Sequence, residues 1–150
     1  MTLYEFIVLI HVIAAVTGLG SGFALPFVLK GVKTAEQAKY SLGLNYLIEK
    51  GVKIGSIALL LTGLILGALN TSLFTEVWYI SSIIIYLAVQ VVAAGIMPKK
   101  IKRMEEIINA HNGNELPEEF TKINLELKPL NAILHTAAVL LIILMVLKPF

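Results

Sequence analysis

The sequence contains no cysteine and no aspartate among its 150 residues. The absence of cysteine excludes disulfides, iron–sulfur clusters and thiolate chemistry. Glutamate is absent from the long apolar stretches, and the sequence has neither a Ser-His-Asp set nor a His-Glu-x-x-His motif. These absences disfavour hydrolysis, and they disfavour any proton pumping that depends on carboxylates inside the membrane.

Charged residues are also scarce. They make up 15% of the chain, whereas 57% of the residues are hydrophobic and the mean hydropathy is +0.85. A soluble domain typically has about 25% charged and about 45–50% apolar residues. The balance therefore indicates an integral membrane protein, and the length indicates a single domain, residues 1–150. The slight positive charge forms no nucleic-acid patch, so the expected environment is the lipid bilayer, with no nucleic-acid partner.

Four stretches are long and apolar enough to form helices across a hydrocarbon core of about 30 Å. Their approximate bounds are 6–29, 51–69, 77–97 and 130–147. Pro98 is expected to end the third span and Pro129 to begin the fourth, because proline is tolerated at the first turn of a helix and just beyond its end. The basic run 99–108 is expected to extend the third helix beyond the bilayer. The pattern predicts an all-α membrane protein, an antiparallel four-helix transmembrane bundle.

Two long connections, residues 30–50 and 99–128, hold most of the lysines and arginines. The positive-inside rule predicts that both loops are cytoplasmic and that both termini lie outside the cytoplasmic (inner) membrane. In the first loop, Thr34-Ala-Glu-Gln37 predicts the start of a short helix on the membrane surface. Trp78 and Tyr79 are expected at the outer interface, as part of an aromatic belt.

His11 is the feature of the first span that points to function, because an ionisable side chain inside the membrane is costly. At helical spacing it shares a face with small residues, including Gly18 and Gly22, so another helix or a flat cofactor can approach closely. Met145 is expected near the depth of His11, and imidazole with thioether is a haem ligand pair that also suits Cu(I). The candidate cofactor-binding residues are His11, Met145, Gly18, Gly22, Ser82 and Tyr86.

The candidate metal ligands are His11, Met145 and His135. His135 is expected about 10 Å from His11 along the membrane normal, so a single ion held between the two is disfavoured. For His11 the alternative interpretation is a neutral histidine bonded to a neighbouring helix. For His135 a ligand or proton-relay role is weighed against a non-functional residue close enough to the interface for water to reach. Gly18-x-x-x-Gly22 and Gly63-x-x-x-Gly67 also suit helix packing, within the chain, in a homodimer or with a partner membrane subunit. His111, in the second loop, is expected to be solvated.

Three short motifs resemble those of a family of uncharacterised predicted integral membrane proteins: Leu9-Ile-His-Val-Ile-Ala-Ala-Val16, Gly18-x-Gly20 with Leu25-Pro26, and Met145-Val-Leu-Lys-Pro149. This four-helix family is similar to copper-resistance D-type membrane domains and to HemJ-type protoporphyrinogen oxidases. In HemJ-type enzymes the first-helix histidine is thought to ligate haem b, and the resemblance implies that role for His11. Those enzymes also have a lysine shortly after the tryptophan of the third helix. Here no lysine follows Trp78 within its span, which argues against the oxidase activity.

We therefore predict a membrane protein that binds haem b, or another porphyrin, in the outer half of the bundle. His11 is the expected axial ligand, with Met145 or an open position opposite. The alternatives are a copper-handling membrane protein and a non-catalytic component that binds a partner helix. Whether the chain is an enzyme stays open.

Overall fold

The computed structural model describes Met1–Pro149, and these residues form helices without a β-sheet. In chain order the elements are α1 (Leu3–Ala15), η1 (Val16–Gly20), α2 (Ser21–Val28), α3 (Ala35–Leu69), η2 (Thr71–Thr75), α4 (Val77–Gln90), η3 (Val91–Ile96), α5 (Met97–Ala110) and α6 (Glu118–Leu147). The turns η1 and η3 are π-helical, so they continue the helices on either side of them.

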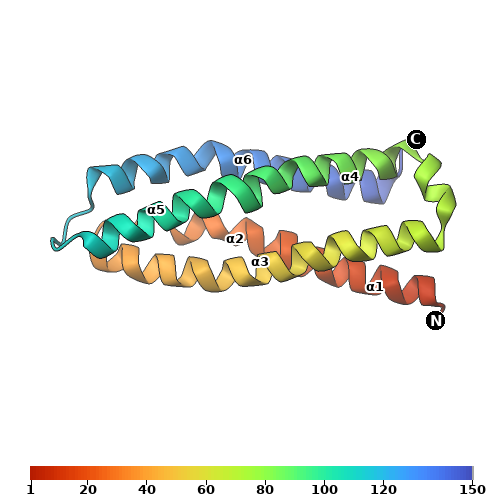
Figure 1. Ribbon diagram of the computed structural model, residues 1–150, viewed down its shortest axis with the longest axis horizontal. Helices are drawn as coiled ribbons and strands as arrows, with labels where there is room; N and C mark the ends of the chain where they lie inside the picture. The colour runs from red at the N-terminus through yellow and green to blue at the C-terminus, as the bar shows by residue number, and fades with distance from the viewer. Residues whose placement is uncertain (150) are drawn as a thin grey trace.

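The elements join into four long helices, each apolar and long enough to cross a membrane. They are Leu3–Val28, Ala35–Leu69, Val77–Ala110 and Glu118–Leu147. This confirms the predicted all-α class and the prediction of four helices long and apolar enough to span a membrane. In Figure 1 the chain runs back and forth along the long axis, and both ends of the chain lie at the same end of the molecule.

The helices extend well beyond the predicted apolar spans. α3 has 35 residues, a length of about 52 Å at 1.5 Å per residue, against about 30 Å for the hydrocarbon core. Its start is where the sequence predicts it, because the Thr34 hydroxyl accepts a hydrogen bond from the Gln37 N–H at 3.2 Å. The expected separate surface helix is wrong, however. Ala38 and Leu42 are buried against the other helices, so the helix continues without a break into the apolar stretch.

Neither proline bounds a helix as predicted, whereas the predicted extension of the third helix through residues 99–108 is confirmed. Pro129 lies inside α6, and Pro98 lies in the first turn of α5, directly after the π-helical turn η3. Proline lacks an N–H and crowds the carbonyl four residues earlier. A wider turn before Pro98 accommodates this, while Pro129 frees the carbonyl of the solvent-exposed Leu125. Each proline therefore lies within a continuous long helix.

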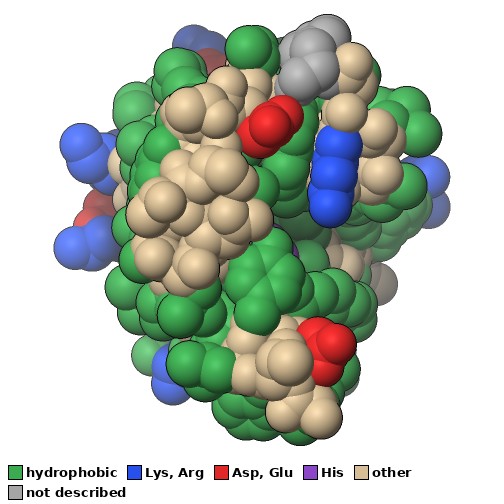
Figure 2. All heavy atoms as spheres, turned by 90° about the vertical axis from the view of Figure 1, so that its right-hand side faces the viewer, with side chains coloured by type: hydrophobic (Ala, Val, Ile, Leu, Met, Phe, Trp, Pro, Cys, Tyr) green, Lys and Arg blue, Asp and Glu red, His purple; other side chains and the backbone are tan. Residues whose placement is uncertain are grey.

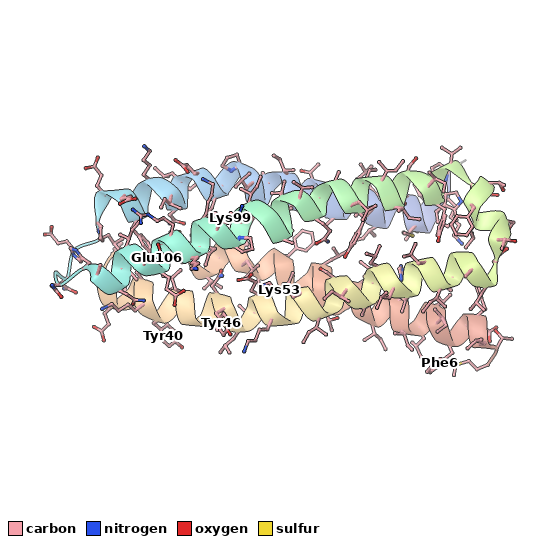
Figure 3. The ribbon with its side chains drawn as sticks, in the orientation of Figure 1. Phe6, Tyr40, Tyr46, Lys53, Lys99 and Glu106 are labelled. Atoms are coloured by element: carbon pink, nitrogen blue, oxygen red, sulfur yellow. The ribbon has the colours of Figure 1, made fainter. Side chains whose placement is uncertain are left out.

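One half of the bundle, the charged end, comprises the first part of α3, α5 and the first part of α6. Figure 3 shows the labelled Lys53, Lys99 and Glu106 in this half and Phe6 near the opposite end. Ion pairs link α5 to α6 here: Lys100–Glu126 and Arg103–Glu119. Beneath them lies a dense core whose central side chains are fully buried: Phe120, Met104 and Ile108.

The other half of the bundle has a smaller core and a close helix crossing. Gly18, in η1, packs directly on Gly55 of α3: a Cβ added to Gly18 would lie 2.9 Å from the Gly55 carbonyl carbon. Gly22, the other half of the predicted motif, has nothing within 4 Å of an added Cβ. Gly18 thus serves helix packing inside the chain, with Gly55 rather than Gly22 as its counterpart.

A methyl group at Gly55 is expected to destabilise the bundle, because it would collide with the backbone of Gly18. Overpacking of this kind costs about 1–3 kcal/mol. Gly55→Ala should therefore lower the thermal unfolding midpoint of the purified protein in detergent, followed by circular dichroism. Gly43→Ala, on the same helix, is the matched control, because nothing lies within 4 Å of its added Cβ. Equal midpoints for the two variants would contradict this crossing.

Candidate functional site

A central cavity of about 490 Å³ lies in the half of the bundle that holds both termini. All four long helices contribute to its wall, which is almost entirely apolar. The polar lining side chains are His11, Tyr79, Ser82 and Tyr86, and none of the lining residues that the structure describes is charged. Figure 2 looks onto this end of the molecule, where hydrophobic side chains surround a hollow. Cavities of about 300–1,000 Å³ with a few polar groups are typical of small-molecule sites.

The position of His11 follows from the crossing of Gly18 with Gly55. The first long helix, Leu3–Val28, is called helix 1, and it runs in the direction opposite to α3. The residue seven positions before Gly18 therefore faces the residue seven positions after Gly55. This pairs His11 with Thr62, and the His11 Nδ1 lies 2.8 Å from the Thr62 Oγ1. The ring also lies over a glycine, since a Cβ at Gly63 would be 3.3 Å from the His11 Cε1.

The hydrogen bonds of Thr62 assign the tautomer of His11. The Thr62 hydroxyl donates its one proton along α3, where the Ala58 carbonyl oxygen lies 2.6 Å away. With its proton directed there, the hydroxyl accepts from His11, and the tautomer that fits this arrangement carries its proton on Nδ1. The Nε2 of the neutral ring keeps its lone pair. A histidine held in this way by its other nitrogen is the usual arrangement of a metal-ligating imidazole.

The other polar groups of the wall are bonded to backbone carbonyls. The Tyr79 hydroxyl donates to the Gly63 carbonyl at 2.9 Å, and the Tyr86 hydroxyl donates to the Ser56 carbonyl at 2.7 Å. Ser82 donates to the carbonyl one turn earlier in α4. Among the described residues that line the cavity, His11 therefore has a polar ring atom, Nε2, that is not used in a hydrogen bond to the protein.

Trp78 and Tyr79 are buried, with 6% and 4% of their surface exposed, so they form no lipid-facing belt. Gly67 leaves room for Tyr79, because an added Cβ there would overlap the tyrosine hydroxyl. Lys148, at the end of α6, covers Trp78 with its Nζ 5.4 Å from the ring centroid. The predicted belt is wrong because both side chains are buried, and Gly67 makes room for that of Tyr79.

The structure brings some of the predicted cofactor residues together and separates others. Met145 lines the cavity from α6, together with His11, Ser82 and Tyr86. Gly18 and Gly22 are not lining residues. The sequence analysis did not identify Thr62 as a site residue. A hydroxyl in the middle of an apolar helix could have indicated it, for the same reason that a histidine in an apolar helix indicated His11.

His135 lies outside the lining of the cavity and has a structural partner. Pro26 has no N–H, so the Gly22 carbonyl lacks the usual helical donor four residues later. The His135 Nε2 lies 3.4 Å from that carbonyl oxygen, and the ring stacks on Phe23 with centroids 4.6 Å apart. Gly22 is eleven residues from His11, roughly 16 Å along a helix. His135 therefore contacts a backbone carbonyl and an aromatic ring rather than the cavity.

His111 also differs from expectation. Its Nε2 is buried without a hydrogen-bond partner, packed against Gly113, so the ring is not simply solvated. Within Met1–Pro149, no group of three or more His, Asp or Glu side chains is placed to hold a metal ion. A metal bound by protein side chains alone would therefore have few ligands in this chain.

Comparison with known proteins identifies a family. No curated protein and no solved structure matches the chain. The model of one family, described as Predicted integral membrane protein (DUF2269), matches residues 5–149, which is nearly the whole sequence and all four long helices. The chain therefore belongs to the DUF2269 family of predicted integral membrane proteins.

Proposed function

We propose that this multi-pass membrane protein binds haem b in the central cavity, with the Nε2 of His11 as an axial ligand. The observation that supports the proposal best is the imidazole in the cavity wall, whose Nδ1 is held by Thr62. An ionisable residue at membrane depth is costly to keep, which favours a functional role for it. The resemblance of the sequence to HemJ-type proteins points to the same residue.

The residues of the cavity suit a porphyrin. A porphyrin ring is flat and largely apolar, as is the lining of the cavity. The ring supplies four nitrogen ligands to its iron, so the protein needs to provide one or two axial ligands rather than a cluster of three. His11 provides one. Met145 lines the same cavity and is the candidate for the second, with an open position as the alternative.

Haem bound here would supply one-electron redox or gas-binding chemistry, and the second axial position decides between them. A thioether ligand from Met145 suits electron transfer, whereas an open position admits an exogenous ligand. We do not propose the protoporphyrinogen oxidase reaction, because the lysine of the third helix is missing. We place the cavity in the outer half of the membrane, since the positive-inside rule puts the charged end in the cytoplasm.

The structure gives the alternatives less support. A copper ion without a porphyrin would have His11 and Met145 as side-chain ligands, whereas His135 contacts Phe23 and the carbonyl of Gly22. Dimerisation through the Gly18 face is disfavoured, because that face already packs on α3. Metal analysis of the purified protein separates copper from haem.

Replacing His11 should abolish haem binding, because the axial bond to the iron is lost. The measurement is the visible spectrum of protein purified from membranes and given haemin, first oxidised and then reduced with dithionite. The wild type should show a Soret band and sharp reduced bands, and His11→Ala should lack them. His135→Ala is the matched control and should keep the Soret band. A wild-type spectrum that stays flat, or a band that persists in His11→Ala, would contradict the proposal.

Replacing Thr62 should weaken haem binding without removing a ligand. Thr62→Val keeps the shape of the side chain but removes the acceptor of the His11 Nδ1–H bond, so the ring orientation and tautomer are no longer held. Loss of such a partner typically weakens metal binding by about 10–100-fold. Haemin titration measures the affinity, and nitrogen NMR of labelled histidine reports the tautomer. Thr62→Ser retains a hydroxyl and should keep the wild-type affinity and tautomer. An equal loss of haemin affinity in Thr62→Val and Thr62→Ser would instead point to a packing effect.

A further inference from the structure

The central cavity lies between two pairs of helices. Helix 1 packs on α3, and α4 packs on α6. The gap between the pairs has two sides, one between α3 and α4 and the other between α1 and α6. The first side is bridged by the hydroxyls of Tyr79 and Tyr86, which donate to carbonyls of α3. These two bonds tie α3 and α4 together along the length of the cavity.

The second side is lined by small branched side chains that are exposed. Val12 and Val16 of helix 1 line the cavity and are 53% and 67% exposed, and Val146 of α6 is 72% exposed. A residue that borders both the cavity and the outside lies at an opening of the cavity. Leu64 of α3, 41% exposed, also fits this description, but α3 is tied to α4 by the two tyrosine bonds. We call these three valines, with the half-exposed Ile142, the lateral mouth.

The lateral mouth ends where the first and last helices meet. Helix 1 contacts α6 through its second part, α2, where His135 stacks on Phe23. Phe23 also lines the cavity, so this contact closes the mouth on the side toward the charged end. Pro26 takes part indirectly, because it leaves the Gly22 carbonyl free for His135.

The lateral mouth opens on the side of a membrane-spanning bundle, so it faces lipid chains rather than water. We propose that the occupant of the cavity enters and leaves sideways, from the bilayer, between α1 and α6. The proposed occupant is a flat, mostly apolar ring compound that dissolves in lipid. It also carries an atom, such as a metal ion, to which the Nε2 of His11 can donate its lone pair. The proposal rests on the proposed function, and haem b is the member of this class that tests it.

The absence of charge in the described lining adds a further constraint. Burying an unpaired carboxylate is very costly, and no lysine or arginine lines the cavity to pair with one. The carboxylates of a haem must therefore stay outside both the apolar lining and the lipid chains, toward the membrane interface at the end of the bundle, while the uncharged edge of the ring enters through the lateral mouth. Protoporphyrin rings with neutral substituents should pass more readily than rings with additional carboxylates.

The test narrows the lateral mouth and measures the rates of haem entry and exit. Val16→Trp and Val146→Trp place a bulky ring at the mouth, and Ile57→Trp, at a 63% exposed position of α3 outside the lining, is the matched control. Apoprotein in lipid nanodiscs is mixed with haemin-loaded vesicles of the same lipid, and the Soret band gives the loading rate. Excess apomyoglobin then captures released haemin and gives the release rate.

The mouth variants should load and release haemin more slowly, by about tenfold, and should reach the wild-type final absorbance. The control should match the wild type. A wild type that never develops a Soret band would overturn the proposed function itself. A wild type that loads while both mouth variants load as fast as Ile57→Trp would overturn only the lateral entry.

Variants that widen the mouth keep the test decisive if the tryptophan variants fail to fold or to fill. Val16→Ala and Val146→Ala remove methyl groups from exposed positions, so little stability should be lost. They should speed both loading and release. Rates equal to those of the wild type in both alanine variants would overturn lateral entry, whatever the tryptophan variants do.

Discussion

The contact between Gly18 and Gly55 is the constraint on which the candidate site depends. Two helices can touch backbone to backbone only where both residues lack a side chain. The crossing sets the register of helix 1 against α3 in opposite directions, and seven residues away on each helix this register brings His11 to Thr62. A shift of one residue would turn the imidazole away from its acceptor, so packing and site geometry have a common origin.

The need to satisfy polar groups inside the membrane explains most of the remaining contacts in this half of the bundle. Tyrosine hydroxyls reach carbonyls of α3, and Thr62 and Ser82 bond within their own helices. His135 lies at the Gly22 carbonyl that Pro26 leaves without a helical donor. With these groups occupied, the Nε2 of His11 stands out as the polar atom at the cavity with a free lone pair.

The parts of the fold that were predictable follow from local patterns. The number of membrane helices follows from the lengths of the apolar stretches, and the start of α3 follows from the hydroxyl of Thr34. The predictions that Pro98 and Pro129 bound their helices were wrong because a π-helical turn precedes Pro98 and because the carbonyl that Pro129 leaves without a donor belongs to the exposed residue Leu125. The prediction that Tyr79 belongs to an aromatic belt was wrong because Gly67 makes room for its side chain inside the bundle.

The sequence by itself determined the class of the protein and marked His11, because run length, charge distribution and the cost of an intramembrane histidine are properties of single stretches. The tertiary structure alone decided that His11 meets Thr62, that Met145 borders the same cavity and that His135 does not. The physical reason is register. His11 and Thr62 are 51 positions apart, and their distance depends on where two glycines allow their helices to cross.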